Sequence, residues 1–198
     1  MSKTLIAAVA GAVVAFGASG ANAQLPEDDL QFFVGGDTAV SIFQDYERPP
    51  GASVDDVDFS WSFNGGVRYK YAGVSAGYVD FGELHARAPA LRDRVEYRGA
   101  TLSGHGFLPL NEQLMLDAEA GVLFWQQDVD FTDAIGTFDA EADDASFLAG
   151  LGAAYQISPD FPLAVTMRYN RYFKVGDDDR TGHDNDIDRV GVGLRFAF

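Results

Sequence analysis

Hydrophobic and polar residues alternate strictly at the end of the chain, from Asp188 to Phe198. Every second residue from Val190 onward is large and apolar, and the residues between them are Arg, Gly or Ala. Because successive side chains of a strand point to opposite faces, the pattern predicts a strand with one wholly apolar face. The opposite face is charged or small, which is typical of a strand with lipid outside and a packed polar interior. The alternative is an ordinary sandwich strand that happens to end in Phe.

Seven earlier segments have the same character, being rich in aromatic and β-branched residues and separated by polar stretches. In the clearest of them, 58–71, Phe59, Trp61 and Phe63 alternate with Ser60, Ser62 and Asn64. The predicted strands are 31–43, 58–71, 74–84, 95–108, 114–126, 145–156, 163–174 and 188–198.

The connections between these strands alternate in length. The short ones are 71–73, 109–113 and 157–162, and the long ones are 44–57, 85–94, 127–144 and 175–187. Three short turns and four long loops are expected of an eight-stranded antiparallel up-and-down transmembrane β-barrel with both chain ends on the periplasmic side. The long connections are predicted to be extracellular loops.

The first 23 residues have the three parts of a secretory signal peptide. Lys3 precedes an apolar run from Leu5 to Phe16, and small residues lead to Ala23. A membrane helix is the alternative, but the run is shorter than the ~20 residues that a spanning helix needs. We expect cleavage after Ala23, which leaves residues 24–198 as one barrel domain.

Three stretches resemble the OmpA-like transmembrane domain, a family of eight-stranded outer-membrane barrels: Gly77–Gly82, Leu102–Leu110 and Asp117–Trp125. The resemblance covers the mature chain and implies location in the cell outer membrane, in contact with its lipid and lipopolysaccharide. It also implies delivery by periplasmic chaperones and the barrel-assembly machinery, for which Phe196 and Phe198 resemble the C-terminal assembly signal. Unlike full-length OmpA, the sequence has no peptidoglycan-binding domain after the barrel, so a tether to the cell wall is not expected.

Charge and cysteine content restrict the partners further. The chain carries 30 acidic residues, and 13 basic ones remain once Lys3 is removed with the signal peptide, a net charge of about −17. Nucleic acid is not expected as a partner, because binding it requires a basic face. No cysteine is present to form a disulfide or a thiolate ligand. The acidic residues of 128–144 and 177–188 could in principle bind calcium, but they lack the spacing of a calcium-binding hand, so solvated acidic loops without a metal or cofactor are preferred.

The predicted inward face collects charges that have to pair, because an eight-stranded barrel has room only for side chains. These residues are Asp37, Arg68, Lys70, Asp117, Glu119, Arg168, Arg189 and Arg195. We expect an ion-pair network that closes the lumen, similar to the networks of family barrels, with Glu119 at its centre and Arg168 at a similar height. A narrow ion channel is the alternative.

The sequence also bears on catalysis and on contact with lipid. Ser103 and His105 share a face, as the Ser and His of a lipid A modifying enzyme would, but His105 is predicted to lie low in the lumen. The sequence therefore favours a structural or interactive barrel over an enzyme. Arg171 shares the outward register of Tyr169 and is predicted to reach lipopolysaccharide phosphate. The sequence names no external ligand, because binding in this architecture resides in the loops.

Overall fold

The computed structural model describes residues 30–44, 53–55, 57–88, 91–132, 137–158, 161–177 and 183–198. The predicted signal peptide, residues 1–23, lies outside these ranges. Strands and short turns make up the described part of the chain, which contains no helix long and apolar enough to cross a membrane.

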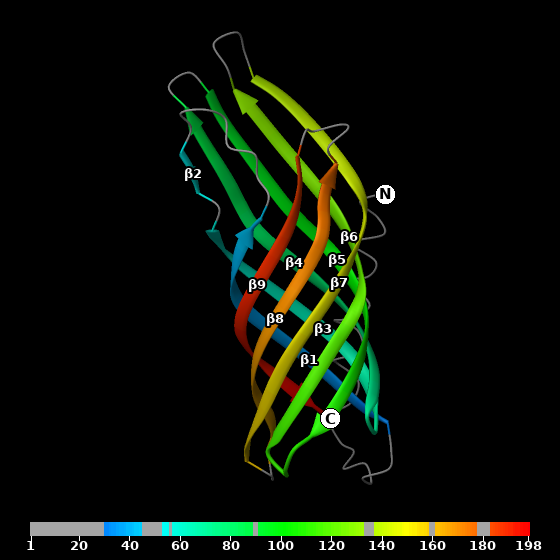
Figure 1. The fold of residues 1–198 in the computed structure, drawn as a ribbon. Helices are drawn as coiled ribbons and strands as arrows, with labels where there is room; N and C mark the ends of the chain where they lie inside the picture. Colours follow the sequence, from blue (N-terminus) through cyan, green and yellow to red (C-terminus); the bar gives the residue numbers. More distant parts are fainter. Residues whose placement is uncertain are drawn as a thin grey trace.

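The strands form one closed antiparallel barrel (Figure 1). They are β1 (Gln31–Phe43), β2 (Ser53–Asp55), β3 (Val57–Tyr69), β4 (Ala72–Ala88), β5 (Leu91–Pro109), β6 (Leu114–Thr132), β7 (Thr137–Ser158), β8 (Phe161–Asp177) and β9 (His183–Ala197). Eight long strands pair around the ring, and the pairing of β1 with β9 closes it. The short strand β2 pairs with β4 alone. The predicted eight-stranded up-and-down barrel is confirmed.

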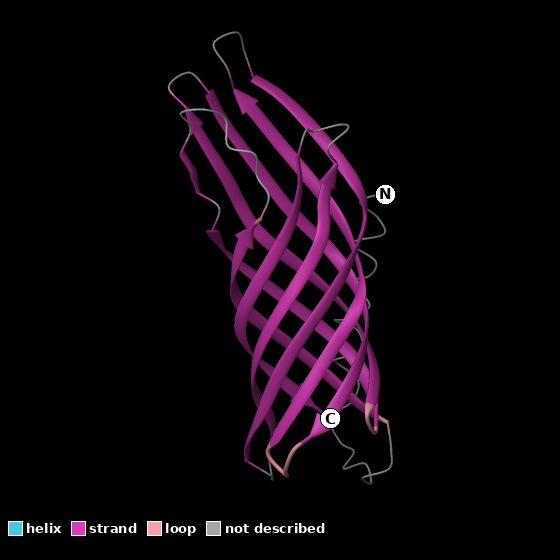
Figure 2. Cartoon of the chain, viewed as in Figure 1, coloured by secondary structure: helices cyan, strands magenta, loops and turns pink. Residues whose placement is uncertain are grey.

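The first residues of β1 and the last residues of β9 lie at the end of the barrel that carries the short turns, which we call the turn end (Figure 2). Lys70 and Tyr71 form the turn between β3 and β4, and residues 110–113 connect β5 to β6. Phe32 and Phe198 exchange two backbone hydrogen bonds of 2.9 and 2.8 Å at the meeting of β1 and β9. In barrels of this kind the short turns face the periplasm.

At the opposite end, which we call the far end, the strands are longer than the sequence predicts. Strand β4 continues to Ala88 and β5 begins at Leu91, while β6 continues to Thr132 and β7 begins at Thr137. The predicted long loops 85–94, 127–144 and 175–187 are therefore wrong, since most of their residues belong to strands. Charged residues such as Asp128 favour the prediction of a loop, but an outward charge suits a strand once that strand has left the lipid.

Part of the way along each of these long strands, the outward face changes from apolar to polar and the inward face from polar to apolar. On β6, Leu116 and Val122 are exposed outward, whereas Gln126 and Asp128 occupy the outward register farther on. Outward residues change from apolar to charged between Val74 and Asp80 on β4, between Leu102 and Arg98 on β5, and between Val190 and Asp188 on β9. Inward residues change in the opposite sense at the same level. The reversal marks the edge of the lipid, beyond which the outer face of the wall meets water.

Beyond this edge the interior holds an apolar layer of side chains. It consists of Phe43, Val79, Phe81, Val95, Tyr97, Leu123, Trp125, Val129, Ala142, Leu148, Tyr172, Val175 and Ile187. Two of its members bond their polar atoms: Trp125 Nε1 donates to Ser146 Oγ at 2.8 Å, and Tyr97 Oη accepts from Gln127 and Asn185 at 3.1 and 2.9 Å. The far end thus has the construction of a small soluble barrel on top of a membrane barrel.

A β-bulge lies near the lipid edge on β4. The pairing of β4 with β5 shifts between Asp80 and Glu83, where Gly82 adopts a φ of 80°. Glycine enters this left-handed region without the strain that a side chain would add. The Gly82 N–H donates to Asp80 Oδ1 at 3.0 Å, and the Glu83 N–H donates to Asp58 Oδ2 at 2.6 Å. A bulge bends its strand, and this one lies where the outer face of the wall changes from apolar to polar.

The two tryptophans test this assignment of faces, because Trp61 is 42% exposed on the outer wall and Trp125 is 2% exposed inside. In bilayers of brominated lipid, the W125F variant, which retains Trp61, should lose much of its fluorescence. The W61F variant, which retains Trp125, should keep its intensity relative to unbrominated lipid. Equal quenching of the two variants would contradict the assigned register.

Candidate functional site

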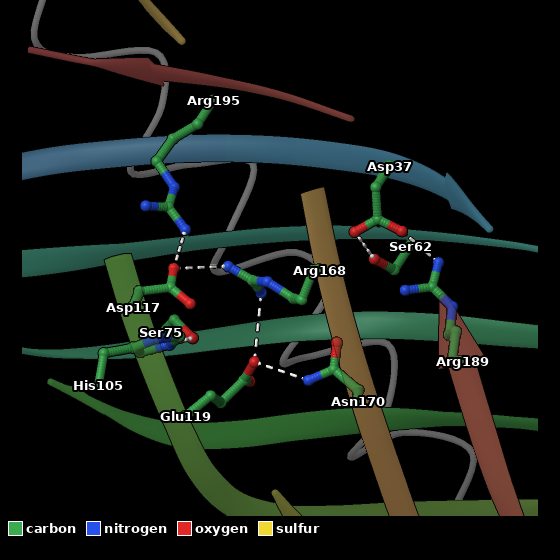
Figure 3. A network of polar contacts seen from close by, with 10 residues as sticks. All are labelled: Asp37, Ser62, Ser75, His105, Asp117, Glu119, Arg168, Asn170, Arg189 and Arg195. Atoms are coloured by element: carbon green, nitrogen blue, oxygen red, sulfur yellow. Dashed lines mark hydrogen bonds and ion pairs between the residues drawn. The ribbon is translucent and has the colours of Figure 1, made fainter. Parts of the chain in front are cut away.

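The interior between the apolar layer and the turn end is polar and charged. We call it the polar layer, and its members are Asp37, Ser62, Ser75, His105, Asp117, Glu119, Arg168, Asn170, Arg189 and Arg195 (Figure 3). All of them occupy inward positions on seven of the eight long strands, every one except β7, so they face one another across the narrow interior.

Arg168 joins two carboxylates within this layer. Its Nη1 donates to Glu119 Oε2 and its Nη2 to Asp117 Oδ2, each at 3.2 Å. Asn170 Nδ2 donates to the same Glu119 oxygen at 3.0 Å, and Arg195 Nη2 donates to Asp117 Oδ2 at 2.7 Å. The predicted centre at Glu119 therefore shifts to the Asp117–Arg168 pair, because Asp117 receives two guanidiniums and Arg168 contacts both carboxylates.

Two glycines on β7 allow these side chains to meet. Asp117 on β6 pairs in register with Gly152, which pairs in turn with Arg168 on β8, so the acid and the base are two strands apart. Adjacent strands are about 4.8 Å apart, and the charged groups reach each other across the bare strand between them. A Cβ at Gly152 would lie 2.7 Å from Asp117 Oδ1, and one at Gly150 would overlap Asn170 Nδ2.

A second ion pair joins the first and last strands of the barrel. Arg189 on β9 donates from Nη2 to Asp37 Oδ1 on β1 and from Nε to Ser60 Oγ at 3.1 Å. Ser62 Oγ donates to the second oxygen of the same carboxylate, Asp37 Oδ2, at 2.8 Å. Because β1 and β9 close the barrel, this pair lies at its seam.

Two residues predicted for the network lie elsewhere. Arg68 donates from Nη1 to Met115 Sδ at 2.8 Å and packs 5.6 Å from the centre of the Phe107 ring, with no carboxylate partner in the described part of the chain. Lys70 is exposed in the turn with a φ of 52°, so its predicted place in the lumen is wrong. Strand β3 ends at Tyr69, and the alternation that predicted an inward Lys70 ends with it.

His105 bonds Ser75 rather than Ser103. Its Nε2 lies 2.8 Å from Ser75 Oγ, and its ring stacks on Phe107 with centroids 5.5 Å apart. Within the described residues, His105 Nδ1 and Ser103 Oγ have no hydrogen-bond partner. In a catalytic Ser–His–Asp triad an acid orients the second ring nitrogen, and His105 makes no such contact with the part of the chain that the structure describes.

Arg171 lies on the outer face of β8, close to the lipid edge. Its Nη2 contacts Asp186 Oδ2 at 2.7 Å and its Nη1 contacts Asp188 Oδ2 at 3.4 Å. Asp186 lies beyond the outward apolar run of β9. Burial alone would raise the pKa of Asp186, but hydrogen bonds from Arg171 and from the Lys174 N–H hold this pKa below its ordinary value. Two carboxylates thus already hold the guanidinium that was predicted to bind phosphate.

The apolar layer and the role of β7 were not predicted from the sequence. The signal for the apolar layer is present, because Leu123, Trp125 and Val129 continue the inward register of β6. Leu123 and Trp125 lie within the predicted strand, whereas Val129 lies beyond its predicted end at residue 126. Within the described residues, no group of three acidic or His side chains is placed to hold a metal ion.

The polar layer predicts an asymmetric response to substitution. Glu119 and Arg168 side chains are 8% and 12% exposed, so Glu119→Ala leaves a buried guanidinium with one carboxylate fewer. We expect this variant to lose about 3–5 kcal/mol of unfolding free energy in urea titrations in micelles. Replacing Glu119 and Arg168 together by Gln should cost less than the sum of the single changes, since Asp117 keeps Arg195. Additive losses would mean that the two side chains are not coupled.

Solved structures with the same fold are outer-membrane barrels. Ail, the attachment invasion locus protein of Yersinia pestis, aligns with a TM-score of 0.53 and 12% identity over 87% of this chain and 100% of its own. Neisserial surface protein A aligns with a TM-score of 0.56 and 18% identity, covering 84% and 97% of the two chains. OprG of Pseudomonas aeruginosa gives 0.56 and 12%, covering 85% and 95%. At these identities the likeness establishes the fold alone.

A search of curated protein sequences gave no match. The family model of the OmpA-like transmembrane domain, however, matches residues 27–198, which include every described strand. The expected location in the cell outer membrane agrees with both comparisons. This protein belongs to the OmpA-like transmembrane domain family of outer-membrane β-barrels.

Proposed function

We propose that this outer-membrane barrel is a structural and interactive protein whose lumen is closed, rather than a pore or an enzyme. The observation that carries the proposal is the stacking of two different interior layers along one axis. The polar layer would hold back apolar solutes through its ion pairs, and the apolar layer would hold back ions because it offers them no ligands.

The space left within the polar layer supports this proposal. The cavity bordered by Asp37, Glu119, Arg168 and Asn170 measures about 20 Å³. Since one water molecule occupies a probe volume of about 10–15 Å³, this space takes a single water rather than a continuous column. Phe81 and Leu123 in the apolar layer are 0% exposed, and Trp125 is 2% exposed. A narrow ion channel would need a wetted path through both layers.

Conductance separates the closed barrel from the channel. In planar bilayers the wild-type protein should leave the current at baseline, and Glu119→Ala alone should also stay silent because the apolar layer persists. A variant that also carries Trp125→Ala should conduct if it folds, since it is weakened in both layers. Discrete wild-type openings that scale with protein concentration would refute the closed lumen, and an open porin serves as the positive control.

The acidic outer surface restricts the partners that the barrel would take. The chain has a formal net charge of −16, and acidic residues follow its lipid edge on β4, β6 and β9, among them Asp80, Asp128 and Asp188. Ail has been solved with the heparin analogue sucrose octasulfate. A polyanion of this kind would be repelled by the surface of the present chain, so we propose cationic or neutral external partners.

Lipopolysaccharide contact through Arg171 remains part of the proposal. The guanidinium lies at the lipid edge and its side chain is 36% exposed, although Asp186 and Asp188 compete with phosphate for it. We expect Arg171→Ala to weaken lipopolysaccharide binding severalfold and Asp188→Asn to strengthen it by releasing a competing charge. The control is Lys70→Ala, which removes a cation at the turn end. Unchanged binding in both Arg171→Ala and Asp188→Asn would exclude the contact.

We also propose that the barrel-assembly machinery, after delivery by periplasmic chaperones, recognises Phe196 and Phe198. Phe196 is exposed on the lipid side, and Phe198 stacks on Phe32 with centroids 6.2 Å apart where the barrel closes. Replacing Phe198 by Asp should lower the yield of folded protein in the outer membrane while leaving refolding in micelles nearly intact. An unchanged outer-membrane yield would remove this role from Phe198.

A further inference from the structure

A cavity of about 200 Å³ lies at the turn end, on the side of the polar layer away from the apolar layer. Its walls include the inward-facing apolar residues Phe33, Phe107 and Ala154. The guanidiniums of Arg68 and Arg195 also line it. The cavity is thus a chamber with apolar residues in its walls and two cations.

Arg195, which lines this chamber, has a buried donor without a partner. The residue is 6% exposed, and its Nη2 bonds Asp117, yet its Nη1 has no partner in the described part of the chain. The guanidinium is held by the rings of Phe33 and Phe107, whose centres lie 5.2 and 5.8 Å from Cζ. A buried N–H without an acceptor is costly, so a carboxylate oxygen that reached this guanidinium would be stabilised by it.

Arg68 supplies the second cation. Its described hydrogen bond goes to the thioether of Met115, a weak acceptor, and its guanidinium shares the Phe107 ring with that of Arg195. Asp117, behind the chamber, is already held by Arg168 and Arg195. Arg68 has no carboxylate of this kind among the described residues. Glu112 also lines the cavity, but from the exposed turn at its border.

We propose that this chamber binds the carboxylate of a small amphipathic organic anion that enters from the turn end. A guanidinium is matched to carboxylate by its planar set of donors, and its charge strengthens each hydrogen bond. The apolar walls would cover the carbon body of the ligand. The chamber is smaller than the roughly 300–1,000 Å³ of pockets for drug-sized ligands, which limits the ligand to a fragment such as an aromatic or short aliphatic acid.

The carboxylate could come from two sources. One is a soluble acid in the periplasm, and the other is the chain itself, since Glu27, Asp28 and Asp29 precede Gln31, which lines the cavity. Both sources present the same group to Arg68 and Arg195. They are distinguished by neutralising the chain's own acids in the combined variant E27Q, D28N and D29N.

The test is calorimetric titration of benzoate into the full chain in nonionic micelles. Arg68→Gln should raise the dissociation constant at least tenfold while leaving the Asp117 ion pairs in place, and circular dichroism verifies that the variant is folded. Lys70→Gln is the matched control, because it removes a cation from the same end but outside the cavity, and its affinity should equal that of the wild type. Equal affinity in all three proteins would mean partition into the micelle and would overturn the proposal.

Two further measurements complete the test. Ala164→Leu, which fills the chamber but keeps both guanidiniums, should weaken benzoate binding. The wild type should bind inorganic phosphate more weakly than benzoate. Phosphate that binds as tightly as benzoate would overturn the organic ligand class. If benzoate binds only after Glu27, Asp28 and Asp29 are neutralised, the chain's own carboxylates occupy the site. If benzoate binds neither protein, the carboxylate site does not exist.

Discussion

The outer face of each long strand meets two solvents along its length, lipid and then water. The inner face of the same strand has to match the interior at each level. Between the turn end and the lipid edge, the outer face meets hydrocarbon and the inner face carries charge. Beyond that edge the outer face meets water, and the inner face becomes apolar. The reversal follows from burial alone, because an outward apolar row is stable only in lipid and an inward one only away from water.

The narrow interior makes the inward residues depend on one another. With eight strands there is space for side chains but not for a hydrating shell, so every charge must be met by another side chain. Asp117, Arg168 and Arg195 meet this demand together, and the bare positions Gly150 and Gly152 are as necessary as the charges because a side chain there would occupy the space of the contact. The apolar layer meets the same demand by packing, with Trp125 and Tyr97 placing their polar atoms on buried partners.

The architecture could be predicted from the sequence because alternation persists along most of each strand. The inward side of Asp37, Asp117 and Arg168 follows from parity, and the strand order follows from the alternating lengths of the connections. Parity gives neither the length of a strand nor the direction of a turn. It therefore predicts an inward Lys70, and it gives no sign that β6 extends past Gln126. The partners within the polar layer also escaped prediction, since whether Arg168 contacts Glu119 alone or Asp117 as well depends on the empty positions of the strand between them.

The ion pair between Asp37 and Arg189 affects how the first and last strands of one chain pair with each other. Before the ring closes, the sheet has two free edges, one carrying an acid on β1 and the other a base on β9. Two copies that approached through the same edge would bring acid against acid or base against base. The opposite edges of one chain are complementary in sign, and they are also always near each other. Self-recognition at the edges therefore favours a closed monomer over a pair of sheets joined edge to edge.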